Sequence, residues 1–504
     1  MKRYCLLLSL VLAGHLDSQI TETYTTVQSD ANEEDLPPPV DPDVLSTLVR
    51  SDQTGGPSLS LGQAMALALQ NNFTRKISQE NVSLARAAVD QARGPVLPQV
   101  GIGVTYQQVN EDQTQVQAGF SPENQTSLDF TASQMIYDDS QVTDFRTSRR
   151  ELEAAQEADD SVKLDVVEET GIAYVSVLSI ASSLRIAEDN LRITRENLEL
   201  SRIRRDIGTA GPEEVLRFES EEAQQESTLW STRSLLHSAV NDLNRALGEP
   251  PDRSWTLEDL SLDTNVFRTT LSVLIPLANT QQSSDQFRVA SIQFALARSP
   301  ELSSLNFSAD AQRLRLAESR RSFFVPEVSA SFVYSQILDS EYTSGALGAT
   351  DEEDTWTFLV GATLPLFEGG SRFGDARQAR AEVRSLEFQE ARLRQTISVN
   401  VSNSLSDLAS SWQSIRLSRI AADRAQENLR IVQDKYEQGS VSNIDLLDAQ
   451  NNALVQRQTA SIELYRFFED LISYQRSLSW AEPLADNAAR EEFVESFTAL
   501  MNGG

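Results

Sequence analysis

The stretch YEQGSVSNIDLLDAQ, residues 436–450, decides the fold of this chain. The residues before it, from about 371 to 438, contain no proline and are dense in Ala, Leu, Arg, Glu and Gln, which predicts one very long helix. Gly439 can adopt the positive φ that ends this helix, and Ser442 can cap a second helix that returns. The stretch therefore predicts the tip of a hairpin of two long antiparallel helices.

A second tip of the same kind, RDIGTAGPEEV at residues 205–215, lies 231 residues earlier (439 − 208). Gly208 stands at its turn, and Pro212 suits the first turn of the helix that follows. Further landmarks recur in the same order, namely ALQNNF (68–73) as ALARSP (295–300) and LPQV (97–100) as VPEV (325–328). The chain is therefore predicted to be an internal duplication.

Between the helices of each copy lie two stretches in which apolar and polar residues alternate. They cover residues 100–106, 128–136, 328–334 and 356–364. Four strands of about ten residues, each with one apolar face, have the length and pattern of transmembrane β-strands. Ordinary soluble hairpins show the same alternation, so the pattern alone leaves that alternative open.

The long helices carry large apolar residues at intervals of seven. The two clearest series are Leu184, Leu191, Leu198 and Ile415, Ala422, Leu429, Tyr436. This spacing is typical of helices that wind around their neighbours as coiled coils. If the alternating stretches were absent from the sequence, the helical pattern alone would predict a simple coiled-coil rod.

Composition narrows the class of protein. The 504 residues carry a net charge of −31, which argues against binding to nucleic acid or to an anionic membrane surface.

Residues 1–19 are predicted to be a secretory signal peptide, because Lys2 and Arg3 precede an apolar run too short to span a bilayer. His15 stands where a bacterial lipoprotein would have its lipidated cysteine, so no lipid anchor is expected. No later segment is predicted to be a transmembrane helix.

We divide the chain into six parts. They are the signal peptide (1–19), an acidic proline-containing leader (20–57), a first repeat (58–254), an equatorial segment between the repeats (255–286), a second repeat (287–482) and a polar C-terminal tail (483–504).

The sequence argues against an enzyme. His237 is the only histidine after the signal peptide, and the only cysteine, Cys5, lies inside it. A histidine-based catalytic triad and a His- or Cys-rich metal site are therefore not expected, and neither is a cofactor. His237 lies among leucines in a helical stretch and is predicted to be structural.

A sheet with open edges cannot lie in lipid, where every backbone polar group must be paired, and single-chain outer-membrane barrels begin at eight strands. If the four strands cross a membrane, several copies must share one barrel. The predicted fold is thus mainly α with a small transmembrane β-barrel contribution: two repeats of strand, strand and long helical hairpin that assemble into a duct.

Several motifs together resemble the TolC family of outer-membrane efflux proteins. They are LPLFEGG (364–370), Tyr436-x-x-Gly439 and Asp445-x-x-Asp448-Ala449. The resemblance covers about residues 59–480. It implies a homotrimer with a twelve-stranded barrel in the outer membrane and a twelve-helix periplasmic extension. It also implies docking to a periplasmic adaptor and an inner-membrane transporter, as the passive duct of tripartite efflux or type I secretion.

The resemblance assigns roles to four residues. Asp445 and Asp448 fall where the family has its periplasmic aperture aspartates, so a trimer would gather six carboxylates as an electrostatic gate. The alternative is that Ser442 and Asp445 simply form a capping box. Gly208 and Gly439 correspond to the hairpin tips that contact the adaptor, although both residues are also expected to end helices.

Two departures accompany these assignments. Glu214 and Arg217 occupy the positions in the first copy that match the aspartate pair, so that copy cannot supply two acids. Val441 stands where the family pattern has a basic residue that helps to latch the tip. The rival functional hypothesis is a periplasmic or surface coiled-coil scaffold that forms no pore.

Overall fold

The computed structural model describes residues 56–110, 122–262, 267–274, 281–342 and 354–502. The signal peptide and nearly all of the acidic leader, residues 1–55, lie outside the described residues. Two long helices dominate the fold: α5 (Asp139–Asp206, 68 residues) and α10 (Ser371–Glu437, 67 residues). At 1.5 Å per residue each is about 100 Å long.

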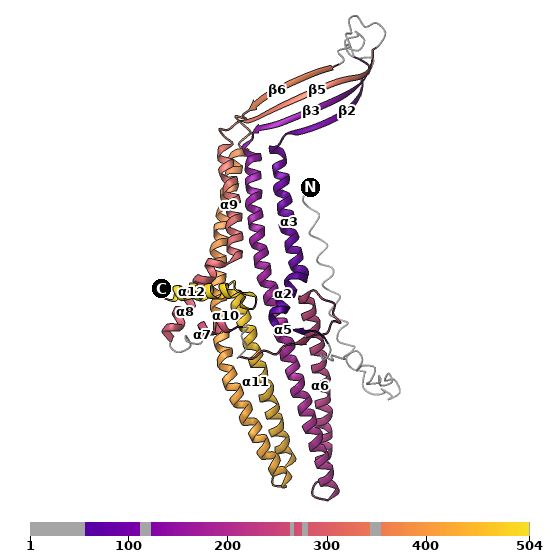
Figure 1. The fold of residues 1–504 in the computed structure, drawn as a ribbon, viewed down its shortest axis with the longest axis vertical. Coiled ribbons are helices and arrows are strands. Elements are labelled where there is room, and N and C mark those ends of the chain that lie inside the picture. The colour runs from indigo at the N-terminus through magenta and orange to yellow at the C-terminus, as the bar shows by residue number, and fades with distance from the viewer. Residues whose placement is uncertain (1–55, 111–121, 263–266, 275–280, 343–353, 503–504) are drawn as a thin grey trace, which may run out of the picture. The chain divides into compact units, whose positions relative to one another are not determined.

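Each long helix turns back into a shorter partner, as the two tips predict. α5 returns as α6 (Pro212–Leu247), and α10 returns as α11 (Asn443–Ser477). α5 also packs against α11, so the two hairpins lie side by side (Figure 1). Both long helices begin near the strands that precede them and continue without a break. Each tip therefore lies at the opposite end of its helix, far from these strands.

The internal duplication is visible in matching pairs of shorter helices. α2 (Leu61–Asn71) and α3 (Phe73–Arg93) in the first copy correspond to α8 (Gln281–Arg298) and α9 (Pro300–Arg321) in the second. Asn72 caps α3, and Ser299, 227 residues later (299 − 72), caps α9. A short polar side chain therefore caps the second helix of the pair in both copies.

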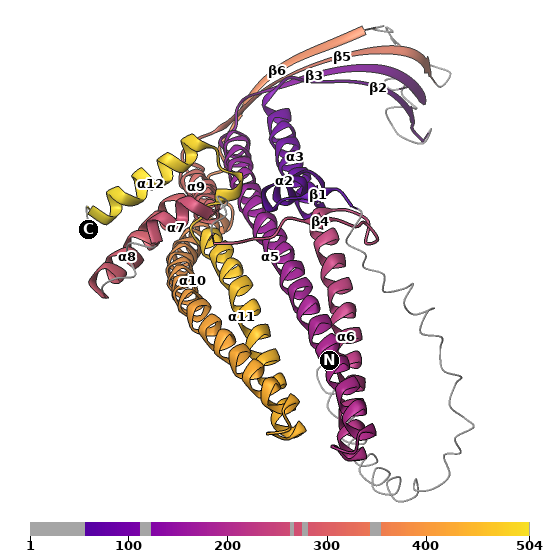
Figure 2. The ribbon, with the colours of Figure 1, turned by 60° about the horizontal axis from the view of Figure 1, so that its bottom comes forward.

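The predicted strands form one antiparallel sheet in the order β2-β3-β5-β6 (Figure 2). β2 (Gln99–Gln108) and β6 (Asp354–Thr363) have ten residues, as expected, whereas β3 (Asn124–Tyr137) and β5 (Glu327–Glu341) are longer, at 14 and 15. β3 and β5 come from different copies and pair with each other. The sheet is thus the place where the two repeats are joined edge to edge.

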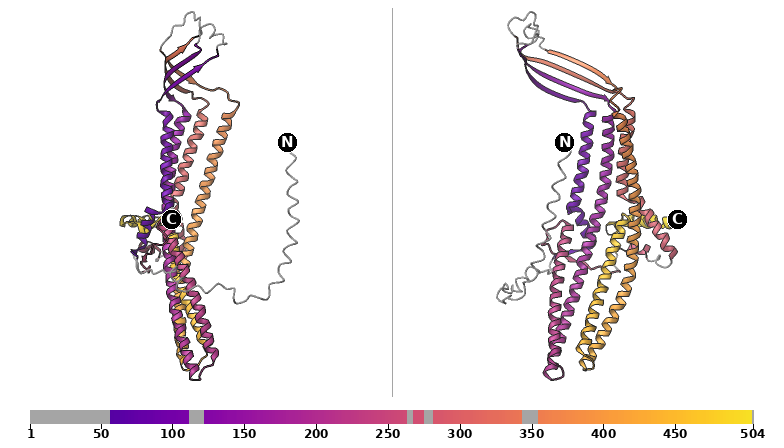
Figure 3. Two further views of the ribbon diagram at one scale, coloured as in Figure 1. Left: turned by 90° about the vertical axis from the view of Figure 1, so that its right-hand side faces the viewer. Right: turned by 180° about the vertical axis from the view of Figure 1, so that it is seen from behind.

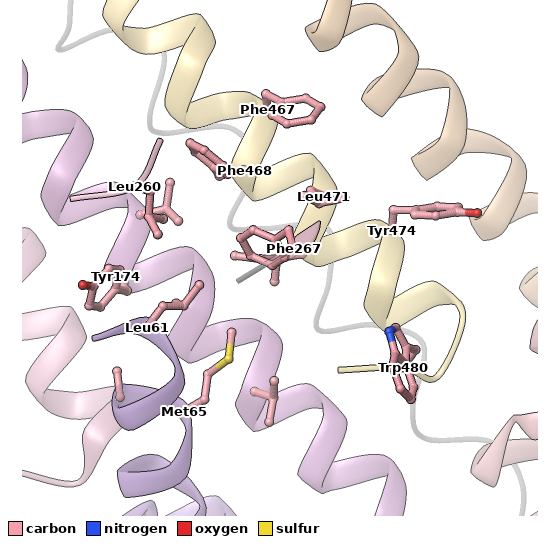
Figure 4. Close-up of a cluster of buried hydrophobic side chains, with 14 of the residues drawn as sticks. Leu61, Met65, Tyr174, Leu260, Phe267, Phe467, Phe468, Leu471, Tyr474 and Trp480 are labelled. Atoms are coloured by element: carbon pink, nitrogen blue, oxygen red, sulfur yellow. The ribbon is translucent and has the colours of Figure 1, made fainter. Parts of the chain in front are cut away.

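The main hydrophobic core lies where α2, α5 and α11 meet the segment between the repeats. Figure 4 shows Tyr174 of α5, Phe468 of α11 and Phe267 of that segment pointing into it. The segment includes β4 (Thr256–Leu257), which pairs with β1 (Ser58–Leu59), and α7 (Arg268–Leu274). Packing of these aromatic side chains therefore joins the segment between the repeats to the middle of the helical region.

Two sequence expectations differ from the structure. Instead of a polar tail, part of residues 483–504 forms α12 (Asn487–Asn502), whose Phe493 and Phe497 are 1% exposed and pack on Phe287 and Phe294 of α8. In addition, one window of α5 is long and apolar enough to cross a membrane by length and composition, although none was expected after the signal peptide. That window is 44% buried within the chain, and α5 contributes several residues to the core.

Candidate functional site

The two hairpin tips have the backbone geometry that their glycines predict. Gly208 has φ of 78° and Gly439 has φ of 71°, and each amide bonds to a carbonyl of the last helical turn. A Cβ atom added at either position would meet no atom within 4 Å. These glycines therefore end the helices by their backbone conformation. Figure 3 shows both hairpin tips at the end of the helical region that is far from the sheet.

Asp445 and Asp448 lie in the first turns of α11, and both side chains are exposed. The capping box that the sequence suggested is present: the Asp445 amide donates to Ser442 Oγ at 3.3 Å, and the Ser442 amide donates to Asp445 Oδ2 at 2.9 Å. The Ser442 hydroxyl also donates to Asp445 Oδ2 at 2.7 Å. The hydroxyl and then the amide lower the pKa of Asp445 below its usual range. Three residues apart on one helix, the two carboxylates share a face.

A contact that the sequence did not predict ties the two hairpins together just above the tips. Tyr436 of α10 is fully buried, and its hydroxyl donates to Glu214 of α6. Arg204 of α5 donates to the Tyr436 carbonyl at 2.6 Å, and its guanidinium lies 4.5 Å from the centre of the Tyr436 ring. Burial and then the adjacent Glu214 carboxylate raise the pKa of the Tyr436 phenol.

Apart from Glu214 and Arg204, the surroundings of Tyr436 are apolar. Phe218 of α6 meets its ring edge-on at 6.4 Å, and Leu446 and Leu447 of α11 belong to the same cluster. Val441, which replaces the basic residue of the family pattern, is half-buried and packs against this cluster. A buried hydrogen bond and apolar packing therefore hold the tips of the two hairpins together within one chain.

A buried polar layer lies further up between α5 and α11. The Gln450 side chain accepts a hydrogen bond from Asn197 at 3.1 Å, and donates to Asn190 at 3.1 Å and to Thr194 at 2.7 Å. All four side chains are at most 4% exposed. Such a layer fixes the register of two helices, because a shift would break these hydrogen bonds between buried side chains.

The sheet has two unlike faces. On one face β2 presents Val100, Ile102, Val104 and Tyr106, each at least 63% exposed. The register continues this face across the sheet to Phe130, Phe332 and Phe358. The opposite face carries mostly glycine, serine and threonine, together with Asp129 and the apolar residues Val333 and Leu359. In addition, β2 and β6 each have a partner on one side only.

His237 is exposed on α6. Among the residues that the structure describes, no group of three or more His, Cys, Asp or Glu side chains could hold a metal ion.

Comparisons with known proteins agree with this geometry. The sequence pattern of the outer membrane efflux protein family matches residues 64–249 and 291–465. The chain is 23% identical to the toluene efflux pump outer membrane protein TtgF of Pseudomonas putida, over 79% of this chain and 78% of that one. It is also 23% identical to the outer membrane protein TolC of Escherichia coli, over 86% of each chain.

Solved structures show the same fold at lower sequence identity. The Campylobacter jejuni outer membrane channel CmeC superimposes with a TM-score of 0.69 at 13% identity, covering 86% of this chain and 89% of that one. The Vibrio cholerae outer membrane protein VceC gives 0.67 at 17% identity, with 84% and 96% covered.

Proposed function

Because the chain belongs to the outer membrane efflux protein family, we propose that it is the outer-membrane duct of a tripartite export system. It would conduct substrates passively from an inner-membrane pump across the periplasm and the outer membrane. The observation that carries this proposal is a sheet with an exposed apolar face and two free edges, continuous with two long helical hairpins. The related proteins above are named as an efflux pump outer membrane protein and an outer membrane protein.

The free edges support a shared barrel. A lone four-stranded sheet in lipid would leave the outer backbone groups of β2 and β6 unpaired. Since the sheet has an even number of antiparallel strands, β2 and β6 run in opposite directions. β6 of one copy therefore meets β2 of the next in antiparallel sense, and a head-to-tail ring of three copies closes twelve strands (3 × 4).

The helices at the two sides of the chain support the same assembly. α3 exposes Phe73 and Leu84, each at 67%, and α10 exposes Phe388 at 75%. These faces are not covered by the chain itself, and large apolar side chains at such positions favour packing against a neighbouring copy. The helical region would then surround a water-filled periplasmic passage.

We assign the tips two roles within this duct. Gly208 and Gly439 meet a periplasmic adaptor, because a missing side chain lets another helix approach closely. Asp445 and Asp448, exposed near the tips, line the periplasmic aperture and attract cations. The capping role of Asp445 is compatible with this, because one of its oxygens makes the hydrogen bonds to Ser442.

Planar-bilayer recording of the purified, detergent-extracted protein tests the proposal. A duct gives single-channel currents under conditions that open the tips, and its mass in detergent corresponds to three chains. The rival scaffold gives no current and stays in solution without detergent. A soluble monomer without any channel activity would refute the duct.

A further inference from the structure

We propose that Asp129 is a fixed anionic site inside the barrel, which enriches cations and cationic cargo in the membrane part of the duct. This inference deepens the proposed function and rests on it. It concerns a residue of β3, at the other end of α5 from the tips and distinct from the aperture aspartates.

The strand register determines which face carries Asp129. Asp129 pairs with Gly103 of β2 and with Ser335 of β5. The neighbouring residue, Phe130, pairs with Ile102 and with Tyr334. Successive side chains of a strand point to opposite faces, so Asp129 lies on the face that carries most of the small polar residues, while Phe130 lies on the apolar face. In a barrel whose apolar face meets lipid, Asp129 faces the lumen.

Asp129 is held in place without being neutralised. Thr105 of β2 and Ser127 each donate a hydrogen bond to its Oδ2 at 3.2 Å, and Ser335 of β5 donates to Oδ1 at 2.5 Å. All of these donors are uncharged hydroxyls. The four strands contain no lysine or arginine, and no ion pair to Asp129 exists among the described residues. The carboxylate therefore keeps its charge available to the lumen.

The position of Asp129 within its strand is also distinctive. The strands contain four other carboxylates, all within three residues of a strand end: Glu327, Asp339, Glu341 and Asp354. Asp129 is in the interior of β3 (Asn124–Tyr137), five residues from its start. A charge at mid-membrane depth is costly unless it meets water, so its presence favours a wet lumen on this face.

The size of the barrel sets the expected effect. Twelve strands about 4.8 Å apart and tilted by about 45° give a radius of about 13 Å, which leaves the carboxylates about 10 Å from the axis. Three charges at that distance enrich cations on the axis about twofold at ~0.1 M salt. The enrichment rises to about fourfold at ~0.01 M salt, because the Debye length there is about 30 Å.

A pair of adjacent cysteine variants tests the face. The only cysteine of the chain is Cys5, within the predicted signal peptide, so Asp129→Cys and Phe130→Cys each introduce a unique thiol. We expect a charged, membrane-impermeant thiol reagent to modify the protein at position 129 and not at position 130 when the channel is in lipid. Modification at position 130 alone, or at neither position, would overturn the lumenal assignment.

Reversal potentials in a salt gradient test the charge. Asp129→Asn keeps the size and the acceptor oxygen, and should lower the cation-to-anion permeability ratio by about twofold or more at ~0.01 M salt, with less effect at ~1 M. The control Thr131→Val removes a hydroxyl from the same face of β3, two residues from Asp129, and should leave the ratio unchanged. If Asp129 only pins the strands together, Asp129→Asn, which keeps the acceptor oxygen, leaves the ratio unchanged as well. A protein that forms no channel refutes the proposed function, whereas a channel with unaltered selectivity in Asp129→Asn refutes only this inference.

Discussion

Replacing Tyr436 by phenylalanine removes the hydroxyl that joins the second hairpin to Glu214 of the first, while the ring stays in its apolar pocket. A hydrogen bond to a charged acceptor contributes about 1.5–3 kcal/mol. Arg204 Nε lies 3.6 Å from the same Glu214 oxygen and can move closer to compensate, so the lower half of this range applies. A loss of about 2 kcal/mol corresponds to a roughly 30-fold larger population of separated tips.

Spin labels at Thr209 and Ser440, one exposed residue on each tip, would report this change as a distance distribution. In Tyr436→Phe the long-distance fraction should rise, and single-channel recordings should show more frequent open events. Tyr465→Phe is the matched control, because it removes another phenol hydroxyl that donates to a carboxylate, Asp259 at 2.9 Å, far from the tips. Unchanged distances in Tyr436→Phe, or an equal change in Tyr465→Phe, would contradict the assignment of Tyr436 as the tie between the hairpins.

Three further predictions concern the tips and the middle of the helical region. Replacing Asp445 and Asp448 by alanine should weaken block of the current by multivalent cations added on the periplasmic side. Unchanged block would refute the proposed role of both residues at the aperture. At Gly439, where φ is 71°, replacement by alanine should lower the free energy of unfolding by only about 1–2 kcal/mol. Replacement by leucine should in addition abolish adaptor binding in a pull-down. Normal binding by the leucine variant would contradict the proposed docking role. Burial raises the pKa of Glu301, but hydrogen bonds from Ser299 and Arg476 outweigh it and lower the pKa to about 2. Ionised Glu301 therefore stabilises the fold at pH values above its ordinary pKa, and this stabilisation is lost as the pH falls toward 2. Glu301→Gln should consequently lower the melting temperature more at pH 7 than at pH 3. An equal decrease in melting temperature at both pH values would argue against the ion pair.

Local patterns in the sequence predicted most of the fold. Gly208 and Gly439 mark the tips because their positive φ is a property of single residues, and the matching caps Asn72 and Ser299 repeat with the duplication. The alternation along β2 likewise predicts which side chains leave the sheet on its apolar face. Each of these signals lies within a few residues of the feature that it predicts.

The sequence did not predict contacts between distant segments. Tyr436 and Glu214 are 222 residues apart, and Gln450 and Asn190 are 260 apart, so no periodicity connects them. The tyrosine could have been noticed as a polar side chain at the end of the seven-residue series that includes Leu429. A buried phenol in such a series needs a hydrogen-bond partner, although the partner itself follows only from the three-dimensional packing.

The C-terminal helix α12 was missed for a different reason. Three glutamates in α12, Glu491, Glu492 and Glu495, suggest a polar segment, although Phe493 and Phe497 are spaced four apart on one helical face. Composition averages over all sides of a helix, whereas burial depends on one side only. The aromatic contacts with α8 then supply the partner that an isolated short helix would lack.

The unpaired outer strands β2 and β6 also have a genetic consequence. In the proposed ring of three copies each subunit pairs one edge with each neighbour, so a single defective subunit prevents the barrel from closing. An allele with proline in the middle of β2 should therefore be dominant over the wild type when both are expressed together. With equal expression and random mixing, only one assembly in eight (½ × ½ × ½) would contain no defective subunit.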